Sequence, residues 1–284
     1  MGHALNPGFG KIMPMVHSNK MFFSSLVSMW SVVYVTALQN VRKEHRIPLM
    51  SLVNAVMKSL IFVLSFVLMF EILGMRAAAI RGDFIIYLMT GIFMFMTHLA
   101  AIGAVSNAPS PASPLMQHGP MTPKVAILGA ALGSLYTQFL SIFILLAGYY
   151  LAFEHFVIYD WIGCLLMFLL AWGSGVAIGI VVYSAQPWAS GFFKLLATFY
   201  QRITMLASGK MFVANMMPAF VINMFDWNPL FHIIDQTRGY AFVNYSPRNS
   251  GLTVPLLITA ACIVIGLITQ YYTSKRASAS WMAK

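Results

Sequence analysis

Side chains that could do chemistry gather in one short segment late in this sequence. Residues 223–242, NMFDWNPLFHIIDQTRGYAF, carry Asp226, His232, Asp235 and Arg238 between two strongly apolar stretches. Ionisable groups in apolar surroundings pair with one another or line a polar route. The segment is too polar to cross a bilayer comfortably and too apolar for an ordinary water-exposed loop, so other elements must determine how it sits.

Two more ionisable residues of interest, His98 and Arg202, lie inside apolar runs, whereas Lys58 and Lys194 lie near the cytosolic ends of theirs, from which they can extend to the surface. An arginine at the depth of Arg202 is costly in a bilayer and usually faces a water-filled route or a partner. It can also extend toward the outer lipid headgroups, and the sequence leaves both roles open. His98 stands alone in its run, and a lone histidine in a helix is more often a hydrogen-bonded packing residue than a ligand.

The sequence lacks the motifs of several enzyme classes. It has no G-x-x-x-x-G-K-[ST] of a P-loop ATPase, no H-E-x-x-H and no serine-hydrolase motif. The glycines of GSGVAIG, residues 173–179, lie within an apolar run rather than after a strand, which excludes a dinucleotide-binding fingerprint. No paired acids lie inside the apolar runs, which argues against an intramembrane enzyme or a proton-coupled carrier. We therefore expect no enzymatic activity, cofactor or metal on this chain.

The elements that position these residues have the composition of a membrane protein. The chain has 284 residues, of which 60% are hydrophobic and 8% are charged, whereas a soluble domain has roughly 25% charged residues. A bilayer is crossed by about 20 apolar residues. Runs of this kind occur six times, at 49–73, 84–105, 125–153, 161–183, 188–207 and 252–272. The predicted fold class is an all-α polytopic membrane protein with six transmembrane helices.

The distribution of charge predicts the orientation. Six spans leave both termini on one side, and placing them in the cytosol puts most basic residues inside and most acidic residues outside, as the positive-inside rule requires. The net charge of +10 is then a topology signal, and no basic run or arginine-aromatic motif indicates nucleic-acid binding. The chain divides into a cytosolic N-terminal part, 1–48, a membrane domain, 49–272, and a cytosolic tail, 273–284.

The apolar run 22–38 admits more than one interpretation. One face of a helix over this run would be apolar, with Phe22, Leu26, Met29, Val33 and Ala37. This spacing favours an amphipathic helix lying in the cytosolic interface, followed by the basic stretch RKEHR. A seventh span and a signal peptide remain alternatives.

Two further patterns indicate contacts. The loop 106–124, SNAPSPASPLMQHGPMTPK, faces the cytosol in this topology, and its five prolines stiffen it. A connector need be only a few residues long, so a docking surface for a soluble partner is favoured over a simple connector. The glycine pairs Gly129/Gly133 and Gly175/Gly179 have the small-xxx-small spacing that lets helices approach closely, within one subunit or between two copies.

Between the last two spans, prolines divide the chain into two short predicted helices, 210–220 and 228–239. Asn228 can cap the second helix, which has a proline in its first turn. At about 1.5 Å per residue, each helix reaches roughly 12–17 Å, half a bilayer, which predicts a re-entrant element in the outer leaflet. We expect Asp235 and Arg238 to face an exit route while the apolar face packs against the spans.

This arrangement resembles a known family. The amphipathic helix with its basic turn, the six spans, the stretch MTPKVAILGAAL and above all Ser208–Gly209 followed by WNPLFHIIDQTRGYAF are similar to the permease subunits of ABC-2-type transporters. The similarity is strongest to exporters of capsular polysaccharide and lipopolysaccharide O-antigen, and it covers most of residues 22–272. It departs at RKEHRIPL, where that family usually has a longer Arg-rich run.

The resemblance implies a homodimer in the bacterial inner membrane, bound to two copies of a P-loop ATPase that hold the ATP and Mg²⁺. The substrate would be a lipid-linked or lipid-terminated glycan, and membrane lipids and periplasmic or outer-membrane export components would be further contacts. A permease for a small lipid or drug, and an ATP-independent channel or scaffold, are the alternatives.

Three groups of residues receive expected roles. Coupling to the ATPase is implied for Ser110, Pro111, Ser113, Pro114, Leu115, Gln117 and His118. The outer gate, made of the re-entrant helices, is implied for Met211, Phe212, Pro218, Trp227, Asn228, Pro229, His232, Asp235 and Arg238. The placement of aromatic residues in the fourth and fifth spans suggests a substrate path along Trp172, Tyr183, Tyr200 and Arg202.

Overall fold

A computed structural model describes residues 31–38, 48–74, 83–109, 122–153 and 156–282. Throughout these ranges the regular structure is helical, and none of these residues forms a strand. The all-α prediction is therefore confirmed for the described chain. The predicted coupling residues, from Ser110 to His118, lie outside the described residues.

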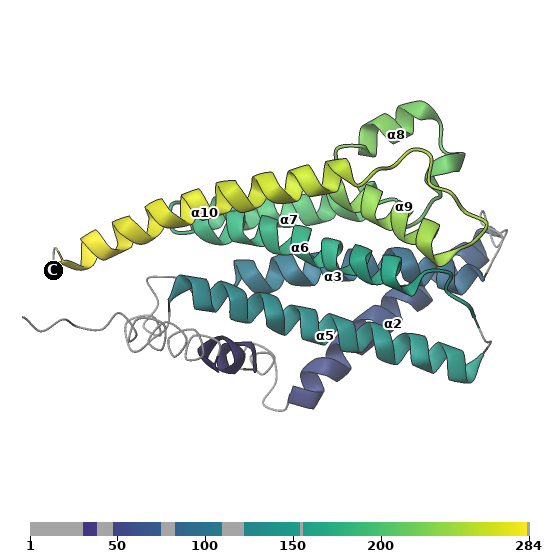
Figure 1. Cartoon of the computed structure of the whole chain (residues 1–284), viewed down its shortest axis with the longest axis horizontal. Coiled ribbons are helices and arrows are strands. Elements are labelled where there is room, and N and C mark those ends of the chain that lie inside the picture. The colour runs from purple at the N-terminus through teal and green to yellow at the C-terminus, as the bar shows by residue number, and fades with distance from the viewer. Residues whose placement is uncertain (1–30, 39–47, 75–82, 110–121, 154–155, 283–284) are drawn as a thin grey trace, which may run out of the picture.

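Five long helices are apolar enough to cross a membrane, and they form one bundle (Figure 1). They are α2 (Pro48–Ile72), α3 (Phe84–Ser106), α5 (Pro123–Ala152), α6 (Trp161–Ala185) and α10 (Thr253–Met282). A hydrocarbon core of about 30 Å needs about 20 helical residues, and each of these helices exceeds that length. The chain is a membrane protein, and five of the six predicted spans are confirmed as long apolar helices.

The remaining predicted span, 188–207, coincides with a helix of mixed character. This helix, α7 (Ser190–Ala207), lies beside α6 and carries Lys194, Gln201 and Arg202. These three polar side chains lower its mean hydropathy, so it is not among the five apolar helices. A sixth span stays a prediction.

Polar caps fix where several of these helices begin. The Asp83 carboxylate accepts from the Ile85 amide at 2.8 Å at the start of α3, and Thr122 accepts from the Val125 amide at the start of α5. At the start of α6, the Asp160 carboxylate accepts from two backbone amides. Such caps satisfy amides that have no partner within the helix, so short polar residues between apolar runs determine the register of the spans.

Glycines on α6 allow it to approach α3 closely. A Cβ at Gly175 would lie 2.4 Å from the His98 carbonyl oxygen, and one at Gly179 would lie 2.8 Å from the Val105 Cβ. This pair therefore packs two helices within a single chain. In the other pair, a Cβ at Gly129 would lie 2.6 Å from the Thr36 Cγ2, so that position also serves a contact within the chain.

Residues 31–38, which Gly129 contacts, form the described part of the predicted interfacial helix. Figure 1 shows this helix nearly end-on beside α5, whereas the long helices lie in the plane of the view. It therefore runs across the bundle rather than along it. Residues 22–30, the first part of the prediction, lie outside the described residues.

The segment after α7 differs from the prediction in its first half. The predicted helix over 210–220 is wrong: residues 210–218 are irregular, apart from the 3-10 turn η1 (Ala214–Met216). Helix begins only after Pro218, as α8 (Ala219–Phe225), because proline suits the start of a helix and disrupts its interior. The second predicted helix is confirmed as α9 (Pro229–Ala241).

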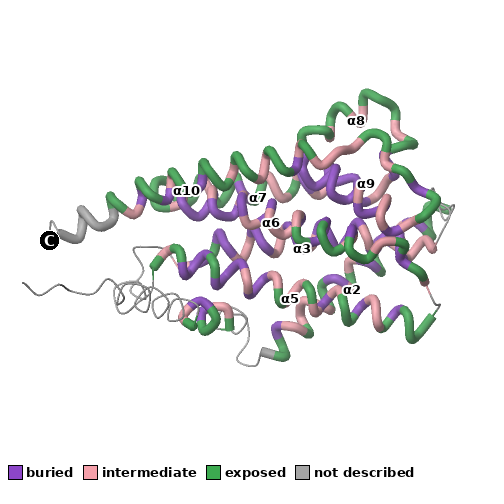
Figure 2. The backbone as a smooth tube through the Cα atoms, viewed as in Figure 1, coloured by how far each residue is buried: buried purple, intermediate pink, exposed green. Residues whose placement is uncertain are grey.

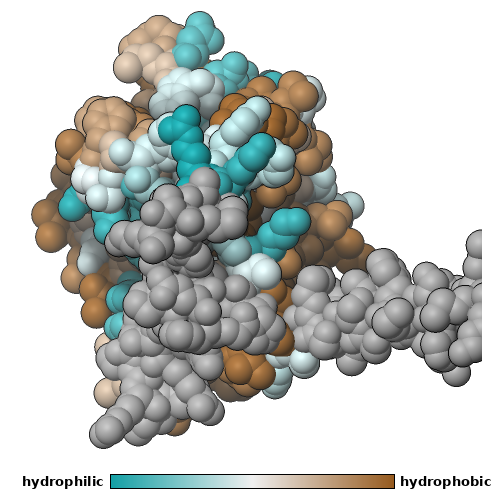
Figure 3. Space-filling model, turned by 90° about the vertical axis from the view of Figure 1, so that its left-hand side faces the viewer, coloured by the Kyte–Doolittle hydropathy of each residue, from teal (hydrophilic) through white to brown (hydrophobic). Residues whose placement is uncertain are grey.

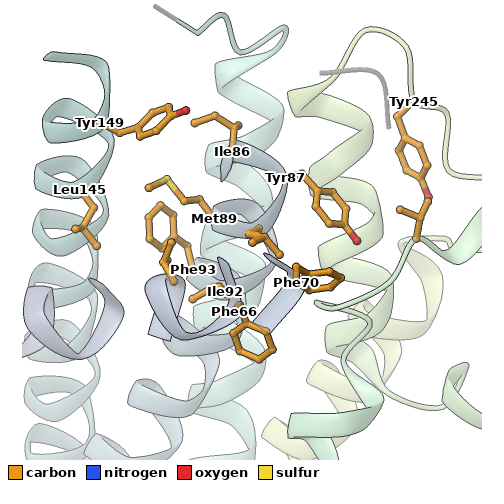
Figure 4. Packing of buried hydrophobic residues seen from close by; sticks show 13 residues of the cluster. Phe66, Phe70, Ile86, Tyr87, Met89, Ile92, Phe93, Leu145, Tyr149 and Tyr245 are labelled. Carbon is orange, nitrogen blue, oxygen red and sulfur yellow. The ribbon is translucent and has the colours of Figure 1, made fainter. Parts of the chain in front are cut away.

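The two short helices have opposite environments (Figure 2). In α9 most residues are buried, whereas no residue of α8 is buried. The largest hydrophobic cluster packs side chains of α2, α3 and α5 against one another, as Figure 4 shows for Phe66, Ile92 and Leu145. The described chain is thus a bundle of long helices with one short helix packed into it.

The two ends of the bundle differ in charge. The end at the left of Figure 1, where α5 starts and α10 ends, carries Lys124, Lys194, Lys275 and Arg276. All described acidic residues belong to the opposite half: Glu71, Asp83, Asp160, Asp226 and Asp235. Figure 3 views the left-hand end and shows hydrophilic side chains near its centre and hydrophobic ones along its sides. The half with the acidic residues also carries the basic residues Arg202, Lys210, Arg238 and Arg248, so it is mixed in charge, whereas the described residues of the other end are basic only.

Candidate functional site

The most polar part of the described bundle surrounds α9, which packs against α3, α6 and α10. Leu230, Ile233 and Ile234 are fully buried, as predicted for its apolar face. A Cβ at Gly163 of α6 would lie only 2.4 Å from the Tyr240 ring, so α9 lies directly against that span. At 13 residues, α9 is about 20 Å long, too short to cross a bilayer.

The start of α9 is built as the sequence predicts. The Asn228 side chain accepts from the Leu230 amide at 3.0 Å, and Pro229 occupies the first turn. The same side chain donates to the Ala207 carbonyl at 3.1 Å. Asn228 therefore caps the first turn of α9 and the last turn of α7 at once.

Arg238 is the most constrained charged group of this site. Its guanidinium donates to the backbone carbonyls of Gly209, Lys210 and Phe212 at 2.7–3.0 Å. It also lies 4.2 Å from the centre of the Tyr87 ring, a cation–π arrangement. Only 1% of the residue is exposed. Arg238 thus fixes the turn 208–212 against α9.

Two glycines make room for this turn. Gly209 has a φ of +71°, a conformation that L side chains rarely adopt. A Cβ at Gly91 of α3 would lie 3.0 Å from the Lys210 Cα and 3.1 Å from an Arg238 nitrogen. Close approach of the turn to α3 therefore depends on the missing side chain at Gly91.

The Lys210 side chain extends from the same turn into an aromatic pocket. Its Nζ lies 3.8 Å from the centre of the Phe95 ring and within 6 Å of the centres of Phe62 and Phe66. The Nζ also donates to the Met205 carbonyl. Burial lowers the pKa of Lys210 to about 8. The aromatic faces and the carbonyl stabilise a cation that the surroundings otherwise disfavour.

The polar face of α9 is closed rather than open. Asp235 accepts from the hydroxyl groups of Tyr245 and Ser250, and Gln236 donates to the Ser250 carbonyl. We expected Asp235 and Arg238 to face an exit route, but each is 1–2% exposed within the single chain. The prediction of an exposed polar face is therefore wrong for the single chain. Buried charged groups are stable only where hydrogen bonds satisfy them, and here other parts of the chain supply those bonds.

Tyr245 completes this closure from the segment between α9 and α10. Burial, together with the neighbouring Asp235 carboxylate, raises the pKa of its hydroxyl well above the ordinary value. The hydroxyl therefore stays protonated and keeps its role as a donor to Asp235.

His232 joins the two short helices. Its Nε2 lies 2.8 Å from the Asp226 carbonyl oxygen and 3.2 Å from the Asp226 carboxylate, and the Gly251 amide donates to its Nδ1. The remaining predicted gate residues lie around this core. Pro218 precedes α8, Trp227 is half-exposed, and Phe212 stacks on Phe225 with ring centres 5.6 Å apart. Met211 is partly buried and packs against the largest hydrophobic cluster.

A second polar cluster lies deeper in the bundle. The imidazole of His98 is fully buried, with Nδ1 2.9 Å from the Ser174 hydroxyl and Nε2 3.0 Å from the Tyr200 hydroxyl. These contacts join α3 to α6 and α7. His98 is a hydrogen-bonded packing residue, as the sequence predicts.

The four residues of the suggested substrate path do not converge. Trp172 donates to the Ala131 carbonyl, Tyr183 donates to the Pro109 carbonyl, and Tyr200 contacts His98. Arg202 is exposed on α7. Within one chain, the three aromatic residues have structural partners and only Arg202 is presented outward.

Sequence reasoning missed Lys210 and Tyr245 as members of the site. Lys210 follows Ser208–Gly209 directly, where the end of a helix leaves carbonyl groups without partners, and this position was the available signal. For Tyr245, the sequence carries no comparable signal, because its contact with Asp235 depends on how the chain folds back after α9.

No group of three His, Cys, Asp or Glu side chains that could hold a metal ion occurs among the residues that the structure describes. Comparison with protein-family models and with curated proteins finds no match to the chain.

Proposed function

We propose that this chain is the membrane-spanning subunit of an ATP-driven exporter of the ABC-2 type, which moves a lipid-linked or lipid-terminated polysaccharide out of a bacterial cytoplasm. The observation that carries the proposal is the short helix α9, enclosed by α3, α6 and α10 at one end of a bundle of apolar helices. A buried half-helix whose charged side chains are hydrogen-bonded within the protein is typical of proteins that control passage through a membrane.

The charge separation supports an orientation with both termini in the cytosol. The end with Lys124, Lys275 and Arg276 would face the cytosol, and the end with the acidic residues and α9 would face outward. The loop 106–124 would then reach the ATPase, and the α9 assembly would form the outer gate.

We place α7 as the remaining span, with its polar residues gathered on one exposed face. Lys194, Thr198 and Arg202 follow one another at helical spacing, and all three are exposed in the single chain. Contact of such a face with lipid would be costly. In a dimer this face would border the route between the two copies, where Arg202 would meet anionic groups of the substrate.

Co-purification tests the central claim. A tagged copy, extracted from membranes of its native host, should form a dimer that retains a P-loop ATPase. Replacing residues 110–118 with a Gly-Ser segment of equal length should release the ATPase and keep the dimer. As the control, the exposed residues Val243 and Asn244 are replaced with Gly and Ser, which should leave both the dimer and the bound ATPase intact. An intact dimer that never retains an ATPase would overturn the proposal.

Surface glycan distinguishes the substrate classes. Deleting the gene should abolish a surface polysaccharide, and a copy with Arg202→Ala should restore export less well than a copy with Arg202→Lys. Normal surface glycan in the deletion strain would exclude the polysaccharide and leave a small lipid or drug as the cargo. Equal export by both Arg202 variants and the wild type would remove Arg202 from the route.

A further inference from the structure

An apolar groove lies over α3, between α5 and α6. It has a volume of about 360 Å³, which is within the range of small-molecule sites. Both α5 and α6 pack far more extensively on α3 than on each other, so a seam stays between them. The lining comes from residues 86–94 of α3, 139–146 of α5 and 158–168 in and before α6. The groove therefore belongs to the half of the bundle that carries the described acidic residues.

The chemistry of the lining suits hydrocarbon. No lining residue is charged, and the others are apolar or aromatic apart from Thr90, Cys164 and Thr237. The hydroxyl groups of Thr90 and Thr237 donate to the carbonyls of Tyr87 and Ile233 in their own helices, and the Cys164 thiol donates to the Thr237 carbonyl. A polar ligand would lose its hydration here without gaining a charged partner.

The groove opens toward the side of the bundle. Its walls carry exposed apolar side chains, with Phe143 of α5 62% exposed and Leu165 of α6 46% exposed. Beyond the wall, the same kind of surface continues along α6 with Ile162 and Leu166, which are also exposed. Because these helices are apolar enough to span a membrane, this side of the bundle meets lipid chains. The groove is thus continuous with the lipid-facing surface.

The length of the groove matches one leaflet. Residues 86–94 of α3 cover about 12 Å along the helix, and half of the hydrocarbon core is about 15 Å thick. At the inner end, the rings of Phe139 and Phe168 meet with their centres 6.2 Å apart. At the outer end lies Trp161, the first residue of α6, of a type that is enriched at membrane interfaces. The groove therefore runs from the interface toward the middle of the membrane.

The width of the groove decides between two apolar occupants. A volume of about 360 Å³ over about 12 Å of helix gives a mean cross-section of about 30 Å². An α-helix about 10 Å across would need about 80 Å². The groove therefore fits a single hydrocarbon chain and is too narrow for a helix of a second copy.

We propose that this groove holds one acyl chain of a phospholipid from the leaflet at the acidic end of the bundle, with the chain lying along α3 and its end near Phe139 and Phe168. Thr237 and Ala241 of α9 border the same groove, so the chain also packs beside α9. This lipid is a structural ligand and not a cargo. The proposal depends on the bundle lying in a membrane and does not depend on any exported substrate.

Photo-crosslinking of the purified full-length chain in nanodiscs, without an ATPase, tests the proposal. The probe is phosphatidylcholine with a diazirine in the lower half of one acyl chain. Peptide mass spectrometry should find the label on Thr90 and Cys164, which are half-buried in the groove, and on Leu166 at the exposed surface. Label on Leu166 alone would overturn the proposal, whether the groove is empty or covered by another copy.

Two matched variants of α6 separate the groove from the general lipid surface. Cys164→Phe places a ring in the groove, whereas Leu166→Phe places the same ring outside the lining. Cys164→Phe should lower the labelling of Thr90 about tenfold, because the ring displaces at least two methylene groups of the chain. Leu166→Phe should leave it unchanged. Wild-type labelling of Thr90 in a folded Cys164→Phe protein would overturn the proposal.

A comparison of host lipids needs no variant. With a trace of the probe, labelling of Thr90 relative to Leu166 should be lower in dimyristoyl phosphatidylcholine, whose linear chains compete for the groove. It should be higher in diphytanoyl phosphatidylcholine, whose methyl branches are too wide for it. Dimyristoyl phosphatidylglycerol should compete as well as the choline lipid, because the lining carries no charge. Equal labelling in linear and branched hosts, or a strong headgroup preference, would overturn the proposal.

The outcome is independent of the proposed function. No transport is measured and no ATPase is present in the crosslinking experiment. Failure of groove labelling overturns this inference alone, and absence of an ATPase after co-purification overturns the exporter proposal alone.

Discussion

The buried cations of the α9 assembly are stabilised without carboxylate partners. Among the described residues, Lys210 and Arg238 form no ion pair, and they instead donate to backbone carbonyls and lie over aromatic rings. The last carbonyls of a helix have no partner within it and carry partial negative charge. At the end of α7, Lys210 satisfies Met205 and Asn228 satisfies Ala207. Lys210 and Arg238 thus donate to carbonyl groups that have no helical partner, because α7 ends and the chain turns at this point.

Arg238→Ala should destabilise the protein strongly. The change removes three hydrogen bonds that a charged donor makes to the carbonyls of Gly209, Lys210 and Phe212, and hydrogen bonds to charged groups contribute about 1.5–3 kcal/mol each. Three such bonds correspond to a loss of at least about 4 kcal/mol, read as a lower midpoint of thermal unfolding in detergent. Arg248→Ala, at an exposed position, should change the midpoint little. Similar midpoints for the two variants would contradict the bracing role of Arg238.

Lys210 should make stability depend on pH above neutrality. Its pKa is lowered to about 8 by burial, whereas the unfolded chain keeps the ordinary value near 10.4. Between these values the unfolded state binds more protons, so stability due to Lys210 rises with pH across that window. Melting curves at pH 7 and pH 10 should show the wild type gaining stability relative to Lys210→Met. Parallel changes in both proteins would contradict a lowered pKa.

The helices of the bundle are held by contacts of two kinds. Glycine faces bring α6 against α3, and polar clusters such as His98, Ser174 and Tyr200 join three helices. Water does not compete for hydrogen bonds inside a membrane, so small residues and buried hydrogen bonds specify which helices meet. The short helix α9 uses both, with Gly163 and Gly91 beside it and Arg238 across the turn.

Two glycines on α6 give a matched test of close packing. Gly175→Ala would place a Cβ 2.4 Å from the His98 carbonyl oxygen, whereas the space around Gly173 is open to 4 Å. Forcing a side chain into a packed contact costs about 1–3 kcal/mol. Gly175→Ala should lower the midpoint of thermal unfolding, and Gly173→Ala should leave it unchanged or raise it. Equal effects would show that helix propensity, rather than the α3–α6 contact, determines the result.

The sequence predicts elements with simple local signals and fails where the chain contacts itself at long range. Apolar length indicates the five long helices, and Asn228 with its following proline indicates the start of α9. The irregular path of 210–217 was missed because Arg238, 26–29 positions later in the chain, holds its first part. The hydrogen-bond partners of Asp235 could not be predicted either, because Tyr245 and Ser250 reach its carboxylate only after the chain reverses direction following α9.

At the scale of the whole molecule, charge and apolar surface are arranged along one axis. The long helices expose apolar side chains, which lie along the sides in the view of the basic end (Figure 3), and most described charged residues lie near the helix ends. The described part of the N-terminal helix crosses this axis near the basic end. A slab of lipid perpendicular to the axis accommodates this arrangement.

Cysteine accessibility should reveal the orientation and the status of α7. In a background with Cys164→Ala and Cys262→Ala, Met216→Cys should react with a membrane-impermeant maleimide on intact spheroplasts. Ala189→Cys, at the other end of α7, should react only after permeabilisation. Both positions are exposed. Labelling of both from one side would show that α7 does not cross, and the reverse pattern would invert the topology.

The enclosed position of α9 also has a consequence for biogenesis. An aspartate or arginine at the centre of a helix costs about 2.5–3.5 kcal/mol during insertion by the translocon, and α9 carries both Asp235 and Arg238 within 13 residues. It is too short and too charged to partition into lipid by itself. On the proposed re-entrant placement, the earlier helices α3 and α6 would assemble first and provide a folded receptor, and α9 would enter the membrane as a step of tertiary folding and not of translocon insertion.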